Sequence, residues 1–354
     1  MDLAVGSSII KSPVFIKRIC WEELSITIIL LLLLSSPAFS ASFDCKKAAS
    51  WLEKTVCSNP ELSRLDEEMA KAYSDAMTSL SPEGQKETKK YQKKWQKELS
   101  SHSEAKYTLG FGDEAGEAEN AVKTAYKKRI KQLQESLIKF NDRIFRNVYI
   151  NYSEPKEECS GIFTKKYFTY PQIENPQNEN EQFWNHLISK QANDFYKAYQ
   201  SYGVCESIYY SYNISFSNKH IISIHGERIV NMVGSPESVA DESFSWLLKE
   251  KRKLKASDLF DSKLAWSKKL VTLVAQKIKE KEITNKTEYK MKFSKLSDRV
   301  KSPSQWVILK YGFGIQFNED DFNDVIRPFP FVITLDWKTL DPYLSKNGRS
   351  LIYE

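Results

Sequence analysis

The sequence is poor in the residues from which most enzyme sites are built. It has four histidines and five cysteines in 354 residues. Only His220 and His225 lie close together, and strand alternation would place residues five apart on opposite faces of a sheet. Neither Gly-x-Ser-x-Gly nor His-Glu-x-x-His occurs, so a hydrolase nucleophile elbow and a zinc peptidase site have no support. We therefore expect a protein that is not an enzyme and has no catalytic residues and no cofactor.

The cysteines also lack the close spacing of zinc ligands. No Cys-x-x-Cys pair is present, so we expect no metal site. Cys45, Cys57, Cys159 and Cys205 lie beyond a predicted export signal. An even number of cysteines in an exported chain favours two disulfides.

Long apolar runs are missing as well. The longest, Leu24 to Leu34, is roughly half of the about 20 residues that span a bilayer. It follows Lys17 and Arg18 and precedes the small residues Ser36 to Ser40. This order is typical of a signal peptide, which we place at residues 1–40. We expect a periplasmic or secreted protein with no stable membrane span after cleavage.

Basic residues are in mild excess, with a formal net charge of +6. The Lys-rich stretch Lys86 to Lys97 carries Tyr91, Trp95 and Leu99 at four-residue steps, which predicts an amphipathic helix with a solvated basic face. An anionic polymer of the cell wall or membrane is the alternative partner for this face. Export argues against nucleic acid.

The most conspicuous acidic cluster is Glu319, Asp320, Asp321 and Asp324. It lacks the alternating ligands and the glycine of a calcium loop. A solvated loop is one interpretation. The other is a partner-binding rim that steers a basic protein such as lysozyme.

The chain up to residue 141 has a helical pattern. Leu62, Leu65, Met69 and Tyr73 recur at three- and four-residue steps and predict a buried helix face. Ser58 or Asn59 would cap this helix, with Ser58 and Glu61 at capping-box spacing and Pro60 in the first turn. Asp66 and Glu67 are expected on its exposed side. Two further helices, over the Lys-rich stretch and from Ala118 to Leu137, would complete a three-helix domain at residues 41–141.

After residue 142 the pattern changes to alternating strands and two long helices. Strands are predicted at 144–152, 162–170, 207–216, 220–227, 243–248, 306–317 and 331–335. Helices are predicted at 181–199 and after Asp258. Residues 142–354 are thus expected to form an α+β domain with a mainly antiparallel sheet, which makes the whole chain a multidomain protein.

The N-terminal motifs resemble a known family. Phe43-Asp44-Cys45, Lys47-Ala48, Glu53, Val56-Cys57, Pro60-x-Leu62-x-x-Leu65-Asp66, Tyr73 and Trp95 follow the order found in the N-terminal domain of LprI-type lysozyme inhibitors. The resemblance covers about residues 42–140. It implies a small helical domain of the bacterial envelope.

The resemblance also implies a disulfide. Members of this family often carry a second cysteine pair just after the tryptophan, where this chain reads Lys97 to His102. Both cysteines are missing together, which suggests that each pair bridges internally. The resemblance therefore implies a disulfide between Cys45 and Cys57. As a separate prediction, Cys159 and Cys205 form the second bridge.

The C-terminal half resembles the ectodomain of the lysozyme-sensing anti-sigma factor RsiV. The resemblance rests on Tyr170-Pro171-x-Ile173, Asp258-Leu259-Phe260, Gly312-Phe313-Gly314-Ile315-x-Phe317 and Leu340-x-x-Tyr343-Leu344. It covers about residues 145–345. Its central Gly-Ala-His-Pro-type segment is represented only by Val233-Gly234-Ser235-Pro236.

Both resemblances imply binding to a lysozyme or similar muramidase, with inhibition by occlusion of the substrate cleft. One alternative is a module that binds peptidoglycan or another envelope polymer through aromatic and lysine side chains. The second alternative is an enzyme acting on the cell wall. A glutamate and aspartate pair suited to sugar hydrolysis is compatible with the many carboxylates of the chain.

Overall fold

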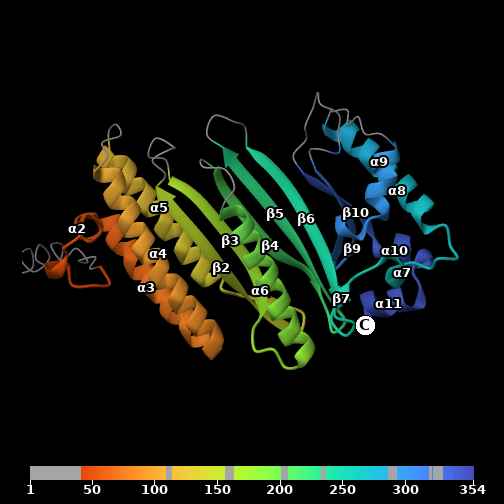
Figure 1. The fold of residues 1–354 in the computed structure, drawn as a ribbon, viewed down its shortest axis with the longest axis horizontal. Coiled ribbons are helices and arrows are strands. Elements are labelled where there is room, and N and C mark those ends of the chain that lie inside the picture. Colours follow the sequence, from red (N-terminus) through yellow and green to blue (C-terminus); the bar gives the residue numbers. More distant parts are fainter. Residues whose placement is uncertain are drawn as a thin grey trace, which may run out of the picture.

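The chain forms three packed regions that follow one another along the longest axis of the molecule (Figure 1). The computed structural model describes residues 41–108, 114–155, 163–200, 206–232, 237–285, 293–318, 321 and 330–354. A helical region comes first, a large sheet with one helix across it lies in the middle, and a small sheet packed with helices ends the chain. This arrangement confirms the predicted fold class, an all-α segment followed by an α+β region with mainly antiparallel strands.

Residues 45–134, called the helical unit below, form a bundle. Leu62, Leu65 and Met69 are all buried, as the predicted helix face requires. α3 and α4 both pack against α5. The elements of the helical unit are η1 (Cys45–Lys47), α2 (Trp51–Ser58), α3 (Pro60–Ser79), α4 (Pro82–Thr108) and α5 (Glu114–Gln134).

The third predicted helix is shorter than expected. α5 ends at Gln134, and Leu137–Phe140 forms strand β1, which pairs antiparallel with β2 (Arg143–Pro155). Leu137 still packs against the core of the helical unit, so the apolar periodicity continues past the end of the helix. Because α5 and the start of β1 pack against the same core, the apolar pattern alone does not show where the helix ends and the strand begins.

The central sheet has seven strands in the order of the sequence, β1 to β7. All neighbours are antiparallel except β3 and β4, which run parallel and are joined by helix α6. α6 lies across one face of the sheet (Figure 1), where Trp184, Ile188 and Ala192 are buried in one core with Phe168 and Tyr210. The remaining elements are β3 (Phe163–Ile173), α6 (Glu179–Gln200), β4 (Glu206–Ser217), β5 (Ile221–Met232), β6 (Ser238–Leu247) and β7 (Arg252–Lys253).

The C-terminal region is built on a second sheet of three strands in the order β10-β9-β8. The predicted single strand at 306–317 is wrong, because Lys310 and Tyr311 turn the chain and Leu309 pairs with Gly312. Helix α9 was not predicted. The elements are α7 (Ala256–Leu259), α8 (Trp266–Asn285), α9 (Phe293–Lys301), η3 (Pro303–Gln305), β8 (Trp306–Leu309), β9 (Gly312–Phe317), β10 (Phe331–Asp336), α10 (Trp337–Leu340), η5 (Asp341–Tyr343) and α11 (Lys346–Tyr353).

One carboxylate joins the helical unit to the central sheet. Glu174, just after β3, accepts a hydrogen bond from the backbone N–H of Ser81 at 2.5 Å and one from Arg146 Nη1 at 2.7 Å. Both charged side chains are almost fully buried, at 3% and 6% exposure. Ser81 lies directly before α4, so the carboxylate also lies at the favourable, positive end of that helix.

Gly84 makes this contact possible. A Cβ atom at position 84 would lie 2.8 Å from Glu174 Oε1 and 3.0 Å from Leu80 Cδ2. In an ordinary helix interior, alanine is more stable than glycine by roughly 0.5–1 kcal/mol. Here the added methyl group competes with the carboxylate for the same space.

We therefore expect Gly84→Ala to lower the free energy of unfolding by about 1–3 kcal/mol instead of raising it. Gly116→Ala in α5 is the matched control, because a Cβ there meets nothing within 4 Å. The control should be as stable as the parent or more so. Urea unfolding followed by circular dichroism measures both, and a stabilised Gly84→Ala variant would contradict the close contact.

The same carboxylate makes stability depend on pH. Burial raises the pKa of Glu174, but the hydrogen bonds from Ser81 and Arg146 outweigh burial and hold its pKa below the ordinary value of 4.5. A carboxylate with a lowered pKa in the folded state stabilises the protein above its unfolded pKa. This stabilisation is lost as the pH falls through the folded pKa.

We expect Glu174→Gln to lower the free energy of unfolding at pH 7 by about 3 kcal/mol, because it leaves the buried Arg146 without its charge partner. Between about pH 5 and pH 3 the variant should lose less stability than the parent. Glu250→Gln, at an exposed turn, is the control. Parallel pH curves for parent and Glu174→Gln would show that the ion pair contributes nothing.

Candidate functional site

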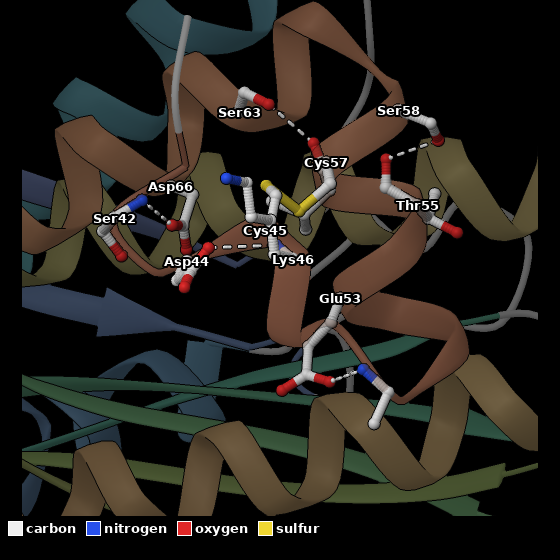
Figure 2. The surroundings of a disulfide bond; sticks show 12 residues. Ser42, Asp44, Cys45, Lys46, Glu53, Thr55, Cys57, Ser58, Ser63 and Asp66 are labelled. Carbon is white, nitrogen blue, oxygen red and sulfur yellow. Dashed lines mark hydrogen bonds between the residues drawn. A yellow bond between two sulfur atoms is a disulfide. The ribbon is translucent and has the colours of Figure 1, made fainter.

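A disulfide fixes the start of the helical unit. Cys45 in η1 and Cys57 in α2 are bonded, with their Cα atoms 5.8 Å apart (Figure 2). This confirms the predicted pairing of these two residues. Cys159 and Cys205 lie outside the described residues, so the second bridge stays a prediction.

The capping residues of this segment differ in part from the prediction. Asn59 caps α3, as one of the two predicted choices, and its Oδ1 accepts from the N–H groups of Glu61 and Leu62. Ser58 does not form the predicted capping box, because it is the last residue of α2. The capping box of the structure is formed by Ser50 and Glu53 at the other end of α2.

Asp66 is buried, which corrects the prediction that it faces solvent. Its side chain accepts a hydrogen bond from the backbone N–H of Ser42 at 2.7 Å and from the Tyr126 hydroxyl at 3.0 Å. Figure 2 shows Ser42 and Asp66 beside the disulfide. Asp66 therefore anchors the segment before η1 to α3 and α5, while its neighbour Glu67 is exposed.

The outer side of α3 borders a shallow depression of about 560 Å³, called the α3 groove below. Ala72, Ala76 and Leu133 are buried beneath it. Exposed side chains form its rim, with Lys71 paired to Asp75 at 2.7 Å. The groove is lined by Glu68, Lys71, Ala72, Asp75, Ala76, Ser79, Leu133, Gln134, Ser136 and Leu137.

A second hollow of about 390 Å³ lies between the helical unit and the central sheet, and we call it the junction cleft. α4 runs beside β2 beyond residue 146, where β1 no longer covers the edge of that strand. Lys94 donates to the backbone carbonyl of Asn151, and the rings of Tyr91 and Tyr149 lie 5.3 Å apart. Side chains from α4, α5, β2, β3 and α6 line the cleft.

One member of the predicted acidic rim, Asp321, is not a free surface carboxylate. Asp321 is 4% exposed, pairs with Arg299 and accepts from the backbone N–H of Asn318 at 2.8 Å. The Asp321 carboxylate is therefore already paired within the protein and is not free to bind a partner. Glu319, Asp320 and Asp324 lie outside the described residues, and their role in partner binding stays a prediction.

The two histidines discussed above do not form a site together. His220 precedes β5, whereas His225 lies within it and contacts Ser243 on β6, with Nδ1 2.9 Å from Oγ. Asp241 lies 3.5 Å from the other ring nitrogen, so a serine, a histidine and an aspartate are neighbours. Ser243 is 1% exposed and its hydroxyl donates to Gln316 at 2.7 Å. This serine therefore serves the contact between the two sheets and is not placed to attack a substrate.

Among the described residues, no group of three or more histidine, cysteine, aspartate or glutamate side chains could hold a metal ion. None of the helices in the described ranges is long and apolar enough to cross a membrane.

Comparison with protein families supports the first of the two resemblances. Residues 45–133 match the model of the family described as lysozyme inhibitor LprI. The match coincides with the disulfide-bearing helical unit. No curated protein matches the chain.

Several chains of solved structures are similar to this chain, among them two DUF3298 proteins. A member of the DUF3298 family from Bacteroides fragilis is 13% identical, with a TM-score of 0.40, over 58% of this chain and 95% of that chain. A DUF3298 family protein from Pseudomonas aeruginosa is 8% identical, with a TM-score of 0.43 and the same coverage. Such scores carry no argument about function. Neither protein is described as an RsiV ectodomain, so that resemblance stays a prediction.

The polar residues of the junction cleft were not predicted from the sequence. One signal was present: Arg129 stands at helical spacing between the buried Tyr126 and Leu133, on the apolar face of α5. A charged residue on such a face indicates a buried polar contact. Glu174 had no comparable signal, because its partner Ser81 is 93 positions away.

The anchoring role of Asp66 is testable. We expect Asp66→Ala to lower the free energy of unfolding by about 3 kcal/mol, because the Ser42 N–H and the Tyr126 hydroxyl lose their acceptor. Glu67→Ala, one position along the same helix and exposed, should change stability by less than about 0.5 kcal/mol. Urea unfolding compares the two variants, and equal stabilities would contradict an anchoring role for Asp66.

Proposed function

We propose that this protein is exported and binds a lysozyme or similar muramidase, which it inhibits by covering the substrate cleft. The match of residues 45–133 to the lysozyme inhibitor LprI family carries this proposal. Inhibition by occlusion needs a shaped and rigid surface but no reacting group. The Cys45–Cys57 disulfide and the buried Asp66 provide such rigidity at the start of the helical unit.

We further propose that the partner docks on the α3 groove. Most residues that line the groove lie within the family match, and only Gln134, Ser136 and Leu137 lie beyond it. Small side chains on its floor allow a partner to approach the helix backbone. Glu68 and Asp75 are exposed carboxylates at its rim, each in a surface ion pair, with Arg64 and Lys71. Surface ion pairs are weak, so a basic enzyme such as lysozyme would compete for these carboxylates.

The test is the rate at which a chicken-type lysozyme clears a cell-wall suspension, with and without the oxidised protein from residue 41 onward. We expect slower clearing at near-stoichiometric protein. Glu68→Lys combined with Asp75→Lys should weaken inhibition by about tenfold or more, because it places positive charge opposite a basic partner. Glu250→Lys combined with Glu237→Lys, both at exposed positions at the ends of β6, changes the net charge by the same amount and is the control.

Two negative results would mean different things. Unchanged clearing, with no complex on a sizing column, would contradict lysozyme binding as a whole. Full inhibition by the double variant would contradict only the α3 groove as the contact surface.

A second candidate function is binding to an anionic envelope polymer. Lys86, Lys89, Lys90, Lys93 and Lys97 are all exposed on α4. Their charges form a basic surface that would attract such a polymer. Binding to purified sacculi in the absence of lysozyme, weakened by salt, would favour this function.

A further inference from the structure

Asp66 is a buried carboxylate of the helical unit whose hydrogen-bond donors are both neutral. It is 4% exposed and accepts from the backbone N–H of Ser42 at 2.7 Å and from the Tyr126 hydroxyl at 3.0 Å. Within the described part of the chain, no lysine, arginine or histidine forms an ion pair with Asp66. A buried charge is costly unless a group of opposite charge lies beside it.

Neither donor compensates the charge of Asp66. Burial and the nearby Asp66 carboxylate raise the pKa of Tyr126, so its hydroxyl stays protonated and neutral at pH 7. The Ser42 donor is a peptide N–H, which carries no charge. A carboxylate offers about four acceptor sites, and these two donors use two of them. Asp66 can therefore accept from a further donor, and a cationic donor would form the stronger bond.

The backbone nitrogen of Ala41 lies close to this carboxylate. Three covalent bonds separate it from the Ser42 nitrogen, and they span at most about 3.7 Å. Because the Ser42 nitrogen is 2.7 Å from Asp66 Oδ2, the Ala41 nitrogen lies within about 6.4 Å of that oxygen. Ala41 is 6% exposed and belongs to the same buried core as Leu62 and Leu65. Its nitrogen is thus held near Asp66.

Ala41 is also the residue that follows the predicted signal peptide. Ala38 and Ser40 place small side chains three positions and one position before the predicted cut, as a signal peptidase requires. Hydrolysis adds one water to the Ser40–Ala41 peptide bond: Ser40 leaves with the new carboxylate, and the nitrogen of Ala41 becomes an α-amino group. This group is protonated at pH 7, because its ordinary pKa is about 8. Cleavage thus turns a neutral nitrogen near Asp66 into a cation.

We propose that cleavage after Ser40 creates an ammonium group on Ala41 that forms an ion pair with Asp66. The pair ties the start of the processed chain to α3, beside the disulfide (Figure 2). The helical unit gains this ion pair only when the signal peptide has been removed, so it reaches its full stability after export. The inference rests on export, which is part of the proposed function, and does not depend on lysozyme binding.

The surroundings of the new terminus favour the ion pair. Cys45 follows Ala41 by four positions and is bonded to Cys57 on α2, so the terminus cannot move far from the bundle. Phe43, between them, packs against the core of the helical unit. A terminus that is already held in place loses little conformational freedom when it pairs, so more of the interaction free energy contributes to stability.

The experiment compares two N-termini on the full chain, exported and processed by a bacterial host. One form has the natural sequence. The other has Gly-Ser inserted between Ser40 and Ala41, so that cleavage leaves two residues in front of Ala41. Intact mass identifies the first residue of each protein. We expect the natural form to begin at Ala41 and to unfold at a Tm about 4 °C or more above that of the inserted form.

Variants connect this difference to Asp66. Asp66→Asn keeps an oxygen for the Ser42 N–H but removes the charge, so the two N-termini should then differ in Tm by less than about 1 °C. Glu67→Gln removes the same charge at an exposed position of α3 and should keep the full difference. If Asp66→Asn does not fold, acetylation of the α-amino group replaces it. We expect Ala41 to react about fivefold more slowly than the inserted glycine, because the ion pair keeps the amine protonated.

The possible contrary results separate the steps of the proposal. An uncleaved chain would contradict export, and a first residue other than Ala41 would contradict the cleavage site. Equal Tm values for the two N-termini would contradict the ion pair while export stands. A full Tm difference in Asp66→Asn, or equal acetylation rates if that variant does not fold, would exclude Asp66 as the partner.

Discussion

The architecture depends on the carboxylate of Glu174, which is shared between two regions with different secondary structure. One oxygen accepts from the backbone in front of α4, and the other accepts from Arg146 on β2. A buried carboxylate is tolerated only when such partners are present. Gly84 leaves the space that this carboxylate needs. The contact therefore requires the right residue at three positions: glycine at 84 in α4, Arg146 on β2 and Glu174 just after β3. The helical unit is thus held to the sheet in one fixed orientation.

This fixed orientation creates the polar cleft beside it. Arg129 comes from the helical unit, whereas Arg146, Asn147 and Asn151 come from the sheet. Neither region alone brings these groups together. The α3 groove, in contrast, is formed mainly by the helical unit, with Ser136 and Leu137 added from the start of the sheet. The groove therefore depends mostly on a rigid bundle, whereas the junction cleft depends on both regions.

The sequence predicted the elements well where the signal is local. The helix from Pro60 and five of the seven strands of the central sheet, β2 to β6, follow from periodicity, and the Cys45–Cys57 bridge follows from the motif order of the resemblance. Predictions failed where residues far away in the sequence determine whether a side chain is buried. Asp66 has the pattern of an exposed residue but is buried by Ser42 and Tyr126, 24 and 60 positions away. The turn at Lys310 was not predicted, because β8 and β9 are both almost fully buried and their sequences together resemble one long apolar strand.

The position of α4 along β2 also bears on how the protein avoids self-association. Beyond residue 146, β2 has a strand neighbour on one side only, and an uncovered strand edge is a template for pairing with another chain. α4 occupies that edge, and Lys94 binds the carbonyl of Asn151 in place of a neighbouring strand. The helical unit thus acts as a protective cover for the sheet. A chain from which it had been removed would expose this edge of β2 for pairing with another chain.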